Sequence, residues 1–185
     1  MVKIRIKPEE YLRFKKERKK IAKIPTEGQF VAVIRVRGTV NIRRDLALTL
    51  KMLRLNRPNH AVVVSLTKEI KGMLLKVNNL IAWGEIDLET FIKLLKERGR
   101  VIGNKRLTDE EVVKRTEGKF KTIEDLAKAI WSRKIHLRDV AWLKPVFRLR
   151  PPKGGYRGTV KKSFFVGGSV GYWGDRIKIL LNHML

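Results

Sequence analysis

The chain has 185 residues, and its 43 Lys and Arg against 18 Asp and Glu give a net charge of +25. A charge of this size predicts an anionic partner, while a hydrophobic content of 43% is enough to bury a core. The absence of cysteine excludes disulfide scaffolds, cysteine-ligated zinc and thiol nucleophiles. No apolar run reaches the roughly 20 residues of a membrane-spanning helix, so we expect a soluble, cytoplasmic protein.

The distribution of charge predicts a folded body between two basic arms. Residues 1–23 carry 10 basic and 3 acidic side chains, and the last 42 residues carry 9 and 1, whereas the stretch 84–130 is nearly balanced with 11 and 10. We therefore expect four parts: a basic helical arm over residues 1–28, a core over 29–84, a helical extension over 85–143, and a second arm over 144–185.

The first arm has the pattern of a cationic amphipathic helix. Between Pro8 and Lys23, the residues Tyr11, Phe14 and Ile21 recur at helical spacing, and lysines cover most of the remaining circumference. Such a helix can bind a polyanion, and it can also lie on an anionic lipid surface.

The segment 30–84 alternates strand and helix patterns. Phe30 to Arg37 alternates as a strand, with Ala32, Ile34 and Val36 on one face and Val31, Val33, Arg35 and Arg37 on the other. We expect Asn41 to cap the next helix, which presents Leu46, Leu50 and Leu53 and should end near residues 56–58.

A second strand over His60 to Ser65, a helix capped by Thr67 and a third strand over Leu80 to Trp83 complete this part. The fold class is therefore α+β, with a β-α-β-α-β core in which two helices cover one face of a small sheet in two layers.

Three more helices are expected downstream, following Asp87, Thr108 and Thr122. Thr108 to Glu111 has the T-x-x-E form of a capping box, and most acidic residues of this region fall in first turns, where they favour the helix dipole.

The last part combines a short strand, a long loop and a terminal helix. Residues 145–150 alternate until Pro151 and Pro152 stop the strand, and 177–185 form an apolar helix that should dock on the body. The loop between them is rich in glycine, aromatic and basic residues, a composition that suits irregular RNA. We expect both arms to order only on binding, because neither has enough apolar surface.

Enzymatic and metal sites find little support in the sequence. Ser65-Leu66-Thr67-Lys68 has the Ser-x-x-Lys spacing of some acyl-transfer enzymes but lacks their companion motifs, and a strand end followed by a helix cap explains it. The histidines His60, His136 and His183 are far apart and match no metal spacing. We predict no catalytic residue, metal or other cofactor, and no small-molecule substrate.

Nucleic acid is the favoured partner, and RNA is favoured over DNA because no helix-turn-helix, zinc finger or basic zipper is visible. The alternative is a peripheral membrane protein that docks through the helix of residues 8–23. The narrow apolar face of that helix, and the basic loop that membrane docking does not explain, argue against it.

Six strings carry a resemblance to a known family. They are Ile34-Arg35-Val36-Arg37-Gly38-Thr39, Leu53-Arg54-Leu55-Asn56-Arg57-Pro58-Asn59-His60, Gly72-Met73 with Lys76-Val77, Trp83-Gly84-Glu85-Ile86, the stretch 99–110 and the stretch 143–152. In this order they resemble the L-thirty family of large-subunit ribosomal proteins, whose eukaryotic relative is called L-seven, and especially its longer archaeal and eukaryotic members.

The resemblance implies a three-stranded antiparallel sheet similar to ferredoxin-like folds. It also implies a non-catalytic constituent of the cytoplasmic ribosome that binds large-subunit ribosomal RNA. It further implies a place near the base of the central protuberance, with 5S RNA and other ribosomal proteins as neighbours.

The residues expected to bind RNA are of two kinds. The stacking candidates are Tyr156, Tyr172 and Trp173. The phosphate candidates are Arg35, Arg37, Arg54, Arg57, Arg100, Lys105, Arg106, Arg148, Arg150, Lys153, Arg157, Lys161 and Lys162.

Overall fold

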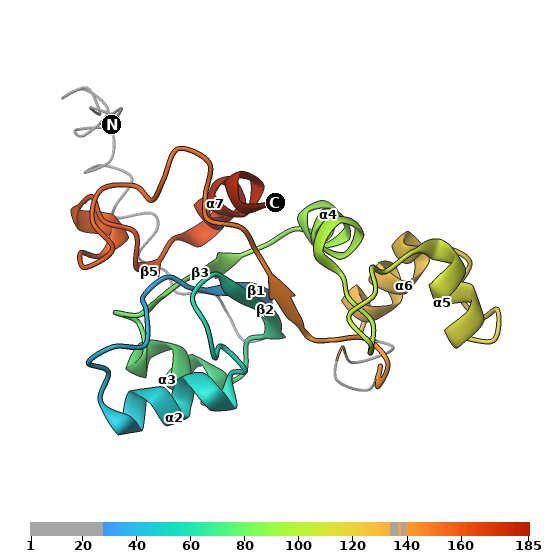
Figure 1. Ribbon diagram of the computed structural model, residues 1–185, viewed down its shortest axis with the longest axis horizontal. Helices are drawn as coiled ribbons and strands as arrows, with labels where there is room; N and C mark the ends of the chain where they lie inside the picture. The colour runs from blue at the N-terminus through green and yellow to red at the C-terminus, as the bar shows by residue number, and fades with distance from the viewer. Residues whose placement is uncertain (1–27, 134–136, 138–139) are drawn as a thin grey trace.

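The computed structural model describes residues 28–133, 137 and 140–185. The predicted amphipathic helix of residues 8–23 lies outside them. Figure 1 shows a central sheet with α2 and α3 together on one side, α7 on the other, and α5 and α6 at the far end of the molecule.

The sheet has five strands in the order β4-β2-β1-β3-β5. The strands are β1 (Phe30–Arg35), β2 (His60–Ser65), β3 (Ile81–Glu85), β4 (Val146–Arg148) and β5 (Gly171–Tyr172). The centre matches the prediction, because β1 pairs antiparallel with both β2 and β3. The predicted number of three was wrong, since β4 adds antiparallel to β2 and β5 adds parallel to β3.

One face of the sheet packs against α2 (Arg44–Met52) and α3 (Lys68–Lys76). Val31 and Val33 of β1 meet Leu50 and Leu53 there, as the periodicity predicted. Thr67 caps α3 by accepting a hydrogen bond from the backbone N–H of Ile70, also as predicted.

The predicted limits of α2 were wrong at both ends. Asn41 has a left-handed φ of 56° and lies before the helix, whose N-cap position is Arg43. The helix ends at Met52 rather than near residues 56–58, because Arg54 takes a left-handed φ of 60° and turns the chain back toward β2. The apolar spacing of the leucines carried no sign of this turn.

The other face of the sheet is covered as well, so the predicted two layers are three. Ala32, Ile34 and Val36 pack against α4 (Leu88–Arg98) and α7 (Ile177–Met184) in a second core. Alternate residues of β1 therefore lie in two different cores, and both faces of the strand are buried. A strand with one exposed face also shows an alternating sequence, so the pattern did not reveal the second buried face.

The C-terminal segment forms part of this folded body. After β4, the chain passes through the short 3-10 helix Phe164–Val166, β5 and a second 3-10 turn, Gly174–Arg176, into α7. Gly84 of β3 lies so close to Gly174 that a Cβ atom there would overlap the Gly174 carbonyl oxygen. The expectation that residues 144–185 order only on binding was wrong, because Phe164, Trp173 and Leu181 supply buried apolar surface of their own.

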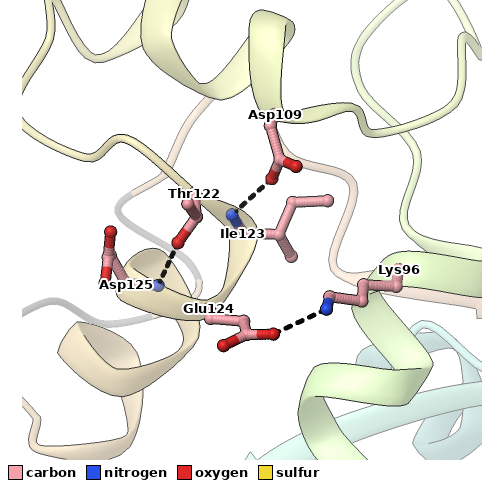
Figure 2. A network of polar contacts seen from close by, with 6 residues as sticks. All are labelled: Lys96, Asp109, Thr122, Ile123, Glu124 and Asp125. Carbon is pink, nitrogen blue, oxygen red and sulfur yellow. Dashed lines mark hydrogen bonds and ion pairs between the residues drawn. The ribbon is translucent and has the colours of Figure 1, made fainter.

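The helical extension is held together by a small polar network (Figure 2). Lys96 of α4 contacts Glu124 of α6 (Ile123–Trp131) at 2.6 Å. Asp109, the first residue of α5 (Asp109–Arg115), accepts a hydrogen bond from the backbone N–H of Ile123 at 2.8 Å. One carboxylate thus lies at the beginning of two helices, and it ties α5 to α6.

The predicted caps of these helices are only partly confirmed. Thr108 accepts from Glu111 N–H, as expected, and Thr122 accepts from Asp125 N–H at the start of the next helix. The Glu111 carboxylate, however, accepts from Arg115 at 3.0 Å. Asp87 occupies the N-cap position of α4 without a side-chain cap bond, and its carboxylate pairs with Lys178.

Replacing Thr122 by alanine should lower the free energy of unfolding by about 1 kcal/mol, because the N–H of Asp125 loses its acceptor at the start of α6. Urea denaturation followed by circular dichroism measures this loss. The exposed neighbour Lys121 provides a control, and Lys121→Ala should change the stability by less than about 0.5 kcal/mol. Equal effects of the two changes would contradict the cap.

Candidate nucleic-acid interface

Three basic side chains form a row across neighbouring strands near one end of the sheet. Arg148 of β4 lies directly opposite His60 of β2. The register of β1 and β2, with Ile34 opposite Ala61, places Arg35 on the other side of His60. Like charges in one cross-strand row repel, so this arrangement needs a compensating interaction.

Arg35 is compensated from within the protein. Its side chain is only 4% exposed, and it donates hydrogen bonds to the carbonyl oxygens of Arg37, Gly38, Leu55 and Asn56 at 2.8 to 3.0 Å. The guanidinium group therefore joins the loop after β1 to the loop before β2. The structure gives Arg35 a scaffold role and leaves its side chain almost no exposed surface for the phosphate contact predicted from the sequence.

The loop before β2 presents Arg57 next to this row. Asn59 has a left-handed φ of 62°, and its side-chain oxygen accepts a hydrogen bond from the Tyr156 hydroxyl at 2.5 Å. Burial raises the pKa of Tyr156 to about 12, so the hydroxyl stays a donor at neutral pH. Tyr156, which the sequence predicted to stack on RNA, is half-buried. Its hydrogen bond to Asn59 holds the C-terminal segment against the loop that carries Arg57.

A second basic cluster lies where α4, the hairpin of residues 100–106 and the end of β4 meet. Burial lowers the pKa of Arg98 and the charges of Arg150, Arg100 and Arg106 lower it further, while Glu97 opposes them. Arg98 also donates to the carbonyl oxygen of Leu185. Its Nε is buried and has no partner in the described part of the chain. Arg100, across an isolated bridge from Arg106, donates to Asn104 O at 3.3 Å.

The two clusters join along β4. Arg148 and Arg150 are two residues apart, about 7 Å along an extended chain, while Phe147 and Leu149 between and beside them point into the core. We call this surface the arginine edge. It comprises Arg57, Arg100, Arg106, Arg148 and Arg150. Within the described part of the chain, none of these five side chains takes part in an ion pair.

The remaining phosphate candidates are spread over other surfaces. Arg54 and Lys105 are exposed and lie close in sequence to members of the arginine edge, and Arg37 is half-buried. Lys153 is exposed just after the two prolines. Lys161 and Lys162 are exposed in the glycine-rich loop, and Arg157 in the same loop lies over the Phe164 ring at 5.1 Å from its centroid.

Tyr172 and Trp173, the other stacking candidates, lie inside the fold. Trp173 is 5% exposed, stacks on Phe164 with ring centroids 4.1 Å apart, and donates its indole N–H to Ser169 O. Tyr172 is 9% exposed and donates a hydrogen bond from its hydroxyl to the Glu85 carboxylate at 2.6 Å. Its pKa is raised, mainly by burial and then by this hydrogen bond. Both rings stabilise the attachment of the C-terminal segment and present no face for a base.

Sequence reasoning did not single out Arg98 or His60 for this surface. Arg98 is the last residue of α4, in a region whose charges are balanced in the sequence. In the fold the charges separate, because acidic residues lie in the first turns of the helices while Arg98, Arg100 and Arg106 lie near Arg150. The signal that could have found Arg98 is the basic string Arg98-Gly99-Arg100 followed by Lys105-Arg106, which flanks a turn.

The structure agrees with the non-catalytic interpretation of Ser65 to Lys68, since Ser65 ends β2 and Thr67 caps α3. Among the described residues, no group of three or more His, Asp or Glu is placed to hold a metal ion. A search of the same residues finds no helix that could span a membrane.

The comparisons with known proteins agree with one another. Residues 31–81 match the model of the family described as ribosomal protein L30p/L7e. The chain is 46% identical over 155 residues to the large ribosomal subunit protein uL30 of Methanococcus maripaludis, an alignment that covers 83% of this chain and 98% of that protein.

Two further archaeal relatives extend this similarity. The uL30 protein of Methanoregula boonei is 47% identical over 153 residues, with 83% of this chain and 98% of that protein covered. That of Korarchaeum cryptofilum is 41% identical over 159 residues, with 86% and 97% covered. Identity of this extent over nearly the whole relative shows common descent, and the chain belongs to the ribosomal protein L30p/L7e family.

Proposed function

We propose that this protein is a structural constituent of the large subunit of the cytoplasmic ribosome, and that it binds ribosomal RNA through the arginine edge. The observation that carries this proposal is the gathering of five arginines from three separate segments on one surface, with no ion pair to any of them among the described residues. Membership of a ribosomal protein family supports the same conclusion.

The electrostatics of the arginine edge favour RNA. A cluster of like charges lowers the stability of the free protein, and phosphates relieve that repulsion while their counterions are released. Arginine also suits this purpose chemically, because its planar guanidinium group can donate two parallel hydrogen bonds to one phosphate. The folded sheet and helices fix the spacing of these charges before binding.

The proposal includes a position in the subunit. The resemblance found in the sequence suggests a place near the base of the central protuberance, with 5S RNA and other ribosomal proteins as neighbours. The exposed lysines of the glycine-rich loop, Lys161 and Lys162, and the exposed Lys153 would extend the RNA contact beyond the arginine edge.

A binding assay with large-subunit ribosomal RNA tests the proposal. The affinity should fall steeply, by orders of magnitude, between about 50 and 200 mM salt, as counterion release requires for several phosphate contacts. The double variant Arg106→Gln/Arg150→Gln should bind roughly 10 to 100 times more weakly and show a shallower salt dependence.

The matched control removes the same charge elsewhere. Lys119 and Lys121 are exposed beside α5 and α6, and Lys119→Gln/Lys121→Gln should bind within about threefold of the unchanged protein. A flat salt dependence, or equal losses from the two double variants, would overturn the arginine edge as the binding surface.

A further inference from the structure

His60 lies beside two members of the arginine edge, Arg57 and Arg148, in an unusual environment. Its ring lies in a row between Arg148 and Arg35, and Arg57 is close enough to influence its charge. Its Nδ1 atom is buried and has no hydrogen-bond partner among the residues that the structure describes. A buried polar atom without a partner is uncommon, and such an atom calls for an explanation, for example a functional role.

We propose that Arg57, His60 and Arg148 form a binding site for a single phosphate group of the RNA backbone. This inference rests on the proposed function and assigns one phosphate contact of the arginine edge to particular residues. Two guanidinium groups supply charge and paired donors, and the imidazole ring gains a second N–H donor and a positive charge when it is protonated.

The frame around this site is rigid. The backbone N–H of Asn59 donates to Arg35 O at 2.8 Å, and the N–H of Leu149 donates to Asn59 O at 3.0 Å, so the loop is bonded to strands on both sides. Tyr156 holds the Asn59 side chain, and Arg35 holds the carbonyls of Leu55 and Asn56. The backbone at Arg57 and His60 is therefore placed without the help of RNA, which lowers the entropic cost of binding.

The groups that face His60 determine its protonation. They are Arg35 of β1, Arg148 of β4, Arg57 of the preceding loop, and the neutral Tyr156 that contacts the adjacent Asn59. Burial lowers the pKa of His60 from its ordinary value, and Arg148, Arg57 and Arg35 lower it further. In the free protein the ring is therefore neutral at pH 7, which avoids three positive charges in one row.

A bound phosphate reverses this balance, because its negative charge favours the protonated ring. The pKa of His60 must then be higher in the complex than in the free protein, and RNA binding takes up a proton. Since the complex binds the extra proton, the affinity rises as the pH falls through the pKa of the bound state, and the gain is complete below the pKa of the free state.

The test measures the affinity for large-subunit ribosomal RNA at constant salt between pH 7.5 and 5.5. The unchanged protein should bind roughly five to ten times more tightly at the lower pH, since a difference of one pKa unit corresponds to a factor of ten. In His60→Gln this gain should disappear, while His183→Gln, which changes an exposed histidine, should keep it.

The pKa of His60, followed by NMR of its ring protons with and without the RNA, should rise on binding, and this readout does not depend on the stability of any variant. Arg148→Gln should raise the pKa of His60 in the free protein and weaken RNA binding. A pH dependence that persists in His60→Gln, or an NMR pKa that does not move, would overturn the phosphate site but leave the proposed function intact. Failure of the unchanged protein to bind the RNA at any pH would instead overturn the proposed function.

Discussion

Arg35→Ala should lower the free energy of unfolding by about 4 kcal/mol, a large share of the 5 to 15 kcal/mol available to a domain. The change leaves the carbonyl oxygens of Arg37, Gly38, Leu55 and Asn56 without their donor, and the Leu55 bond is buried. A hydrogen bond from a charged group contributes about 1.5 to 3 kcal/mol, so even partial replacement by water leaves a large deficit. Guanidinium chloride denaturation measures the change.

Two further variants separate the geometry of Arg35 from its charge. Arg35→Lys keeps the charge but cannot reach both loops at once, so it should still cost about 2 kcal/mol. Arg44, exposed on α2, serves as the control, and Arg44→Ala should change the stability by less than about 0.5 kcal/mol. If Arg35→Ala were as stable as Arg44→Ala, the scaffold role would be wrong, and the phosphate contact predicted from the sequence would be the better explanation.

Trp173→Ala should lower the free energy of unfolding by about 4 kcal/mol, as large aromatic truncations in a core do. The variant loses the stack on Phe164 and the bond to Ser169 O, and these contacts hold the glycine-rich loop to the sheet. Limited proteolysis should then cut within residues 153–170 at a protease concentration that leaves the unchanged protein intact.

A conservative variant and a surface variant complete this test. Trp173→Phe keeps an aromatic ring but loses the N–H donor, so we expect a loss of about 1.5 kcal/mol. Val166 is 61% exposed in the same loop, and Val166→Ala should have almost no effect on stability. Strong RNA-binding loss in Trp173→Ala at full stability would show that the ring contacts RNA instead.

The sequence was informative where a pattern repeats over a whole element. Alternation over β1, and the i, i+4, i+7 spacing of leucines along α2 and its end, gave the correct elements because the apolar positions of these elements meet a continuous core. Threonine caps at Thr67, Thr108 and Thr122 were predictable for a local reason, since the acceptor and the donor are three residues apart.

The same reasoning missed features that depend on residues distant in the sequence. Strand β5 is only Gly171 and Tyr172, too short for any periodic pattern, and it exists because β3 offers a free edge. Trp173 lies among glycines, without a periodic pattern of apolar residues around it. It is nevertheless buried, because the Phe164 ring stacks on it. A short stretch of sequence around β5 or Trp173 does not show that β3 or Phe164 will be its neighbour in the fold.

The candidate RNA surface was predicted in composition but not in arrangement. Arg57, Arg100, Arg106, Arg148 and Arg150 are exposed or half-exposed in the structure, but charge alone does not distinguish them from Arg35, which the loop carbonyls surround. The choice between a ligand contact and a scaffold bond depends on the turn at Arg54, whose left-handed backbone the sequence did not reveal.

The short outer strands of the sheet also affect how copies of the protein meet. β4 has three residues before Pro151 and Pro152, and β5 has two, so each border offers few open backbone groups to a neighbouring molecule. Arg148 and Arg150 add repulsion between copies along one of these borders. Short and charged edge strands of this kind hinder the growth of a β-sheet from one molecule to the next. They therefore protect the newly synthesised protein against aggregation before assembly.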